Sequence, residues 1–120
     1  MKLEENKNQI LEIINNSGLE NLYKNKNDMY IDIIKNNEWI VEYIDMDSLE
    51  YEVLLSLLKT SGHILKYIKN QTEELCRTAL YKEPWNLKYV INQTDKLCLF
   101  AVKQNGKSIE YVKTKQKKFV

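Results

Sequence analysis

Residues 71–90 read QTEELCRTALYKEPWNLKYV, and residues 93–112 read QTDKLCLFAVKQNGKSIEYV. The two segments align without a gap at an offset of 22, which places leucine on leucine, cysteine on cysteine and alanine on alanine. A fixed period of this length is typical of proteins built from stacked structural repeats. Because each copy buries one side against its neighbour, positions shared between copies are explained by packing before any chemistry is invoked.

The pattern continues toward the N-terminus. Residues 53–68 match residues 75–90 at the same offset, whereas residues 29–44 match 53–68 only at an offset of 24. The two extra residues fall in the connection 45–50, which we predict to be a loop. We predict one helical-repeat domain over residues 1–120. Its parts are a degenerate copy at 3–24, copies near 28–44, 52–68, 74–90 and 96–112, and a basic tail at 113–120.

The first half of each copy has the pattern of an α-helix. In the copy near 74–90, apolar residues recur at helical spacing, which predicts a helix from about Glu73 to Lys82 with one buried face. Thr72 and Thr94 precede acidic residues and are suitable N-caps. The sequence therefore predicts a buried α-helix at the start of each copy.

The second half of each copy predicts a shorter helix. Gly62 and Gly106 stand where a left-handed residue commonly ends a helix. Pro84 cannot adopt a positive φ, so we expect it to open the second helix, roughly Trp85 to Val90. Such a short helix depends on its neighbours for burial. The predicted fold is all-α, a short α-solenoid of helix-turn-helix repeats of about 22–24 residues.

Composition narrows the class of protein. No run of residues approaches the roughly 20 apolar positions that a membrane-spanning helix needs. The segment from Met1 to Asn6 lacks the apolar stretch of a signal peptide. We therefore expect a cytosolic protein, in a bacterial or host cell, with no membrane contact.

Charge is unevenly distributed along the chain, although the net charge is only +1. Residues 28–52 carry eight acidic side chains against Lys35, a net charge of −7. Residues 91–120 carry seven lysines against two acidic side chains, a net charge of +5. Such asymmetry points to charged partners more than to the fold.

The acidic segment is the predicted binding surface. Trp39 and Trp85 occupy one repeat position that holds His63 and Lys107 in other copies, so stacking does not require tryptophan there. Exposed tryptophan is a common binding anchor. By contrast, a tyrosine recurs in every copy, as at Tyr43, and suits packing. The predicted partner is a protein with a basic surface. The predicted contact residues are Trp39, Glu38, Glu42, Asp45, Asp47, Glu50, Tyr30, Tyr51 and Trp85.

The reactive side chains do not form a catalytic pattern. Cys76 and Cys98 occupy equivalent positions on apolar helix faces, which favours buried thiols over a disulfide or a metal site. His63, the only histidine, has no obvious nucleophile beside it in the sequence. We predict no catalytic residue, no metal and no cofactor.

Two other functions remain open. The lysine tail could bind nucleic acid through Lys113, Lys115, Lys117 and Lys118, although it has no arginine and no aromatic groove to accompany it. A small hydrolase could use carboxylates such as Asp28 and Asp32, although no paired base, nucleophile or metal set is visible.

The strings QTDKLCLFAVKQNG at 93–106 and SIEYV at 108–112 resemble a family of short helical repeats described as domain of unknown function 4116. Pro84 departs from the glycine of that family's units. The resemblance implies an all-helical repeat array found in bacteria and viruses, and it brings no activity or site residue. Together with small size and the acidic segment, it leads us to expect a phage or mobile-element inhibitor. Its target would be a nucleic-acid-handling host enzyme, an anti-CRISPR protein being one example.

Overall fold

The computed structural model describes residues 26–113, which form α-helices and 3-10 helices with no strand among them. The α-helices are α2 (Lys26–Asn36), α3 (Tyr51–Thr60), α4 (Glu73–Lys82) and α5 (Asp95–Gln104). The 3-10 helices are η2 (Glu38–Glu42), η3 (Met46–Ser48), η4 (Gly62–Tyr67), η5 (Pro84–Tyr89) and η6 (Gly106–Tyr111). The all-α prediction is thus confirmed for this range, and the degenerate copy predicted at 3–24 lies outside it.

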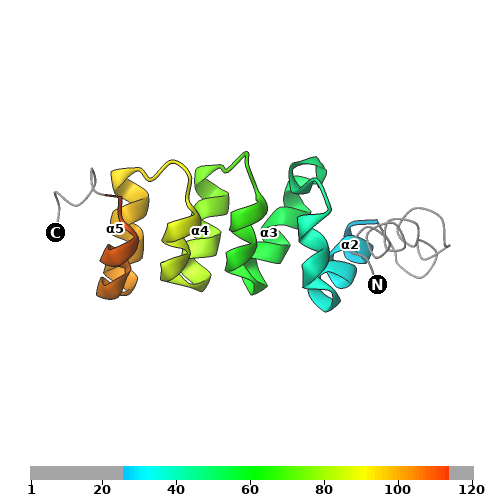
Figure 1. The fold of residues 1–120 in the computed structure, drawn as a ribbon, viewed down its shortest axis with the longest axis horizontal. Helices are drawn as coiled ribbons and strands as arrows, with labels where there is room; N and C mark the ends of the chain where they lie inside the picture. The colour runs from blue at the N-terminus through cyan, green and yellow to red at the C-terminus, as the bar shows by residue number, and fades with distance from the viewer. Residues whose placement is uncertain (1–25, 114–120) are drawn as a thin grey trace. The chain divides into compact units, whose positions relative to one another are not determined.

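The chain divides into two compact units, residues 1–53 and residues 54–120, with the boundary inside α3. In the C-terminal unit each α-helix is followed by a 3-10 helix, and Figure 1 shows α4 and α5 side by side. Helix α4 packs against α5, η4 and η5, while η5 packs against both η4 and η6. The elements of this unit therefore bury their apolar sides against one another.

The start of α4 and α5 follows from the two threonines. The Thr72 hydroxyl accepts a hydrogen bond from the Leu75 amide, and the Thr94 hydroxyl accepts one from the Leu97 amide, both at 3.2 Å. Each hydroxyl satisfies one of the amides that the first helical turn leaves without a partner. The predicted caps, and the predicted bounds of the helix at 73–82, are confirmed.

The prediction that a left-handed glycine ends the first helix was wrong at both positions. Neither Gly62 nor Gly106 has a left-handed backbone. The α-helices instead end where the backbone becomes extended, at Glu83 with φ −150° and at Asn105 with φ −154°. The glycines are the first residues of η4 and η6, as Pro84 is of η5. The second element of each copy is a 3-10 helix, a form that proteins use in short pieces of this kind.

Gly62 is required by close packing. An added Cβ at this position would collide with the side-chain amide of Asn86 and would lie 2.8 Å from the Ala79 carbonyl oxygen. The Asn86 amide is fully buried and donates to that same carbonyl at 3.1 Å. Gly106, at the equivalent place two copies later, has nothing within 4 Å of its virtual Cβ. The shared glycine therefore has a packing reason in only one of the two copies.

Two glutamines join neighbouring copies in the C-terminal unit. The Gln71 amide nitrogen donates to the carbonyls of Leu65 and Tyr89 at 3.2 and 2.9 Å, and its Oε1 accepts from the Ile91 amide at 2.9 Å. The Gln93 side chain repeats the pattern 22 residues later. Its partners are the carbonyls of Leu87 and Tyr111 and the amide of Lys113, each at 2.9 Å. One side chain in each copy thus supplies the partners that the ends of two 3-10 helices need.

In the N-terminal unit, α2 packs against η2. The buried residues described there are Met29, Ile34, Ile40, Val41, Met46 and Val53. The connection 45–50, predicted as a loop, contains the single 3-10 turn η3, because Met46 is buried and the Asp45 carboxylate accepts from the Asp47 amide at 3.2 Å. The connection that holds the two extra residues therefore contains a capped 3-10 turn.

Candidate binding sites

The helix η2 presents a tryptophan between two carboxylates. Ile40 and Val41 are buried, whereas Glu38, Trp39 and Glu42 are exposed, with 42% of Trp39 accessible to solvent. Residues three apart lie on the same side of a 3-10 helix, so Glu42 lies one turn beyond Trp39 on its face. We call Glu38, Trp39 and Glu42 the Trp39 site.

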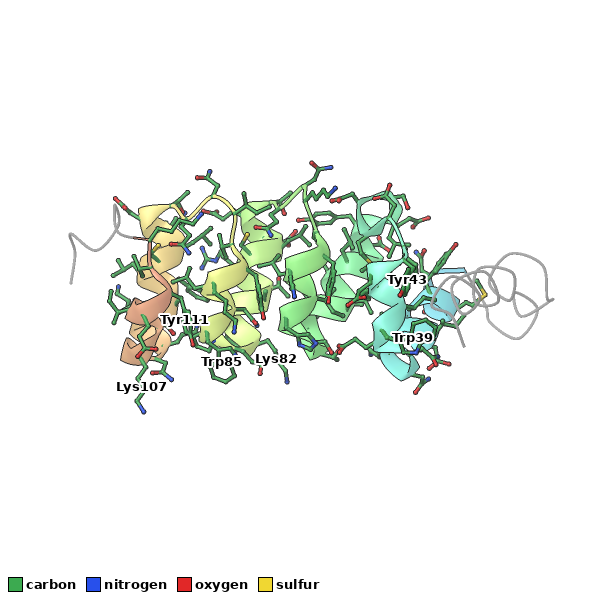
Figure 2. All side chains as sticks on the ribbon, in the orientation of Figure 1. Trp39, Tyr43, Lys82, Trp85, Lys107 and Tyr111 are labelled. Atoms are coloured by element: carbon green, nitrogen blue, oxygen red, sulfur yellow. The ribbon has the colours of Figure 1, made fainter. Side chains whose placement is uncertain are left out.

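The Trp39 ring is held by a neighbour. It packs edge-on against Tyr43, with ring centroids 6.2 Å apart and planes at 73°, a favoured aromatic geometry. Figure 2 shows both side chains on the same part of the ribbon. Tyr43 recurs in every copy and was predicted only as a packing residue. The repeat pattern could not reveal that it also supports the variable residue four positions earlier.

Asp45 and Glu50, which were also predicted for this surface, accept hydrogen bonds within the N-terminal unit. The Asp45 carboxylate caps η3 by accepting a hydrogen bond from the Asp47 amide. Glu50 accepts a hydrogen bond from the Asn27 side-chain amide at 2.8 Å. Tyr30 lies half-buried on α2, and Tyr51 is 40% exposed as the first residue of α3. These residues lie elsewhere in the N-terminal unit. Among the predicted contact residues, only the three of the Trp39 site share one short helix, η2.

Trp85 lies in a different electrostatic setting, although it occupies the repeat position of Trp39. It is 44% exposed on η5 and lines a hollow of about 270 Å³ whose other lining side chains include Lys107, Glu110 and Tyr111. Figure 2 shows Trp85 beside Tyr111, with Lys107 nearby. This hollow carries both signs of charge, so it offers no purely acidic surface to a basic partner.

Of the predicted lysine tail, only Lys113 lies within the described residues. Its amide donates to Gln93, and its ammonium group donates to the Ile91 carbonyl at 2.8 Å. Both the backbone amide and the ammonium group of Lys113 therefore make hydrogen bonds within the C-terminal unit. Lys115, Lys117 and Lys118 lie outside residues 26–113.

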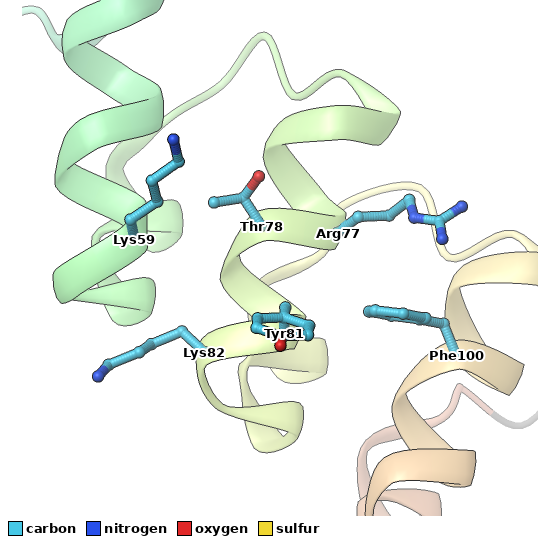
Figure 3. A pocket seen from close by; sticks show the side chains of 6 residues that line it. All are labelled: Lys59, Arg77, Thr78, Tyr81, Lys82 and Phe100. Atoms are coloured by element: carbon cyan, nitrogen blue, oxygen red, sulfur yellow. The ribbon is translucent and has the colours of Figure 1, made fainter.

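A third surface was not predicted from the sequence. An open groove of about 760 Å³ in the C-terminal unit lies against α3, α4 and α5. Figure 3 shows the side chains that line it, which are Lys59, Arg77, Thr78, Tyr81, Lys82 and Phe100. We call these six residues the basic groove. These residues vary between the copies in the sequence, but they come from three different helices, so their spacing in the sequence could not show that they line one groove.

Both cysteines are buried thiols, as predicted. The Cys76 sulfur lies 3.5 Å from Gln71 Oε1, and the Cys98 sulfur lies 3.7 Å from Gln93 Oε1. Burial, with a smaller contribution from Glu73, raises the pKa of Cys76 to about 11. The pKa of Cys98 is also raised, chiefly by burial. Because the thiolate is the reactive form, both side chains are poorly suited to nucleophilic chemistry near neutral pH.

The remaining candidates for chemistry are surface residues. Asp28 and Asp32 are exposed on α2, four residues apart. Within residues 26–113, no group of three or more His, Cys, Asp or Glu side chains could hold a metal ion. In the same range, no helix has the length and apolar character that crossing a bilayer demands.

Comparisons with protein-family models, with curated proteins and with solved structures give no match to this chain. The resemblance to the helical repeat family of unknown function stays a prediction.

Proposed function

We propose that this chain is a non-catalytic protein that binds a basic protein surface through the Trp39 site. In this proposal the helical copies stack as a short α-solenoid, and the exposed residues that differ between copies make the contacts. The contacts that recur at an offset of 22 in the C-terminal unit support such a stack. The observation that carries the binding proposal is an exposed tryptophan between two exposed carboxylates on one 3-10 helix.

Binding would proceed by steering and then anchoring. Residues 28–52 carry a net charge of −7, which attracts a positively charged surface and speeds its encounter. Trp39 then buries its exposed face against the partner, and Glu38 and Glu42 pair with cations around it. Its edge contact with Tyr43 limits the motion of the ring before binding, so less conformational entropy is lost when the complex forms.

The partner class follows from charge. Enzymes that handle nucleic acids carry basic surfaces because they contact phosphates. A small acidic protein that covers such a surface would act as an inhibitor. A phage or mobile-element protein that blocks a host nuclease, as an anti-CRISPR protein does, is the specific form of this proposal.

Affinity capture with matched variants tests the proposal. Wild-type, Trp39→Ala, Glu42→Lys and Trp85→Ala chains serve as bait in a host lysate, and captured proteins are quantified by mass spectrometry. We expect one set of basic proteins to be retained by the wild type and by Trp85→Ala, and lost from Trp39→Ala and Glu42→Lys. Glu42 is a better choice than Asp45, because reversing Asp45 would also remove the cap of η3.

A fluorescence titration then locates the contact. The chain has two tryptophans, so Trp85→Phe leaves Trp39 as the only indole reporter. Titration of this variant with a captured basic protein should change the Trp39 emission, because binding removes the ring from water. If all four baits retain the same proteins, or if Trp39 emission is unchanged at saturation, the Trp39 site is not the contact.

A further inference from the structure

The basic groove combines cations with aromatic rings. Among the described residues that line it are three cationic side chains, Lys59, Arg77 and Lys82, and two rings, Tyr81 and Phe100, but no carboxylate. Lys59 comes from α3 and Phe100 from α5, while the other four residues lie on α4 (Figure 3). A concave surface of one charge sign attracts ligands of the opposite sign. The groove is therefore suited to an anionic ligand.

The aromatic residues add a second requirement. Tyr81 is 76% exposed, so the face of its ring is accessible to a ligand. The Arg77 guanidinium lies over the Phe100 ring, 4.8 Å from its centroid, and both side chains line the same groove as Tyr81. The Tyr81 ring and the Arg77 guanidinium both suit a planar group that can stack. An anionic ligand with planar groups fits the groove better than one that has only carboxylates.

The repeat does not require these side chains. At an offset of 22 the position of Tyr81 holds Lys59 and Lys103, that of Arg77 holds Leu99, and that of Lys82 holds Gln104. Packing between copies therefore leaves these positions free to vary. Their joint presence beside one groove calls for another explanation.

We propose that the basic groove binds single-stranded nucleic acid. Lys59, Lys82 and Arg77 contact backbone phosphates, and a base stacks on Tyr81. Proteins that bind single strands without sequence preference combine a positively charged groove with stacking aromatics. An acidic peptide would pair with the cations but would leave Tyr81 unused. This inference uses residues separate from the Trp39 site and goes beyond the function proposed for it.

Fluorescence anisotropy tests this proposal on the full chain. The probes are fluorescein-labelled oligo-dT and oligo-U of about ten nucleotides, a length within the range that single-strand-binding folds cover. We expect both to bind, and oligo-U to bind more tightly only if a ribose hydroxyl is contacted. Tyr81→Ala should weaken binding about five- to tenfold, the loss of one stacked base. The double variant Lys59→Glu, Lys82→Glu should weaken it by about tenfold or more at low salt.

Salt dependence separates phosphate contacts from general weakening. Each phosphate contact on a single strand contributes about 0.7 to the slope of log affinity against log salt concentration. Replacing both Lys59 and Lys82 should therefore reduce that slope by about 1.4. Tyr81→Ala should leave the slope unchanged. Thermal melts should match the wild type, because all three side chains are exposed.

Matched controls make the result decisive. Lys66→Glu changes an exposed lysine outside the groove, and Trp85→Ala removes an exposed ring elsewhere in the unit. Both should bind the probes like the wild type. Three results overturn the proposal. In the first, the groove variants bind as tightly as the controls. In the second, a poly-glutamate peptide displaces the oligonucleotides as well as unlabelled oligo-dT does. In the third, binding is lost only when Lys115, Lys117 and Lys118 are changed to Gln, which assigns it to the lysine tail.

Discussion

The two units of this chain share a repeat pattern but differ in what joins their copies. In the C-terminal unit, Gln71 and Gln93 each bind the backbone of two successive 3-10 helices. At the equivalent position of the N-terminal unit stands Leu49, which cannot make such hydrogen bonds. The surfaces differ as well, since the Trp39 site is acidic and the basic groove is cationic.

This difference separates two kinds of position in a repeat. Residues that satisfy buried backbone groups are held by the cost of leaving those groups unpaired, so they recur wherever the packing recurs. Exposed residues are under no such constraint. In the N-terminal unit the Trp39 site is acidic, whereas in the C-terminal unit the basic groove is cationic. A repeat position that varies is therefore the better guide to binding, and one that persists is the better guide to stability.

The largest expected effect is a loss of stability when a glutamine of the C-terminal unit is replaced. Gln93→Ala removes the partners of two carbonyls and one amide around a side chain that is only 5% exposed. We expect the free energy of unfolding to fall by about 2–4 kcal/mol in chemical denaturation. Leu49→Ala, at the same repeat position in the other unit, should cost about 1 kcal/mol, because Leu49 is half-buried and bonds nothing through its side chain.

A control separates the buried network from glutamine itself. Gln104 is exposed and donates to the Leu80 carbonyl at 3.2 Å. Gln104→Ala should cost less than about 1 kcal/mol. Equal losses for Gln93→Ala and Gln104→Ala would contradict the role assigned to the glutamine network.

Gly62 and Gly106, both in the C-terminal unit, should respond differently to replacement by alanine. Gly62→Ala places a methyl group against Asn86 and the Ala79 carbonyl, and should lower the free energy of unfolding by about 1–3 kcal/mol. Gly106→Ala meets open space and should be neutral or stabilising by up to about 1 kcal/mol. Thermal or urea denaturation of the pair checks this. Similar effects for the two variants would show that the close approach of Gly62 and Asn86 is absent in solution.

The smallest expected effect concerns pH. Burial raises the pKa of Cys76 from its ordinary value of 9.0 to about 11, so the unfolded chain releases this proton first as pH rises. The contribution to stability is complete below pH 9 and is lost between about pH 9 and 11. Urea denaturation at pH 8 and pH 10 should show a smaller decline for Cys76→Ala than for the wild type. Identical declines would mean that Cys76 is accessible to water in the folded chain.

Local signals in the sequence were sufficient for the α-helices. The apolar spacing at Leu75, Cys76, Ala79 and Leu80 and the capping threonines placed α4 at residues 73–82, because both depend on neighbours within one turn. The 3-10 form of the second elements and the extended backbone at Glu83 and Asn105 were not predicted. They depend on contacts with the next copy, which no short window of sequence contains.

The candidate sites were predictable to different degrees. Trp39 with Glu38 and Glu42 was found because its three residues lie within five positions of one another. The basic groove joins Lys59 to Phe100 across three helices, so sequence spacing alone could not reveal it. The role of Gln93 was missed for a related reason, since its partners Leu87 and Tyr111 lie on opposite sides of it in the sequence.

Gln71 and Gln93 each hold two successive 3-10 helices of the C-terminal unit together. Amide hydrogen exchange by NMR tests this role directly at Ile91 and Lys113, whose amides donate to Gln71 and Gln93. We predict that both amides are protected in the wild type, that Gln71→Ala exposes Ile91, and that Gln93→Ala exposes Lys113. Rapid exchange of both amides in the wild-type chain would contradict the account.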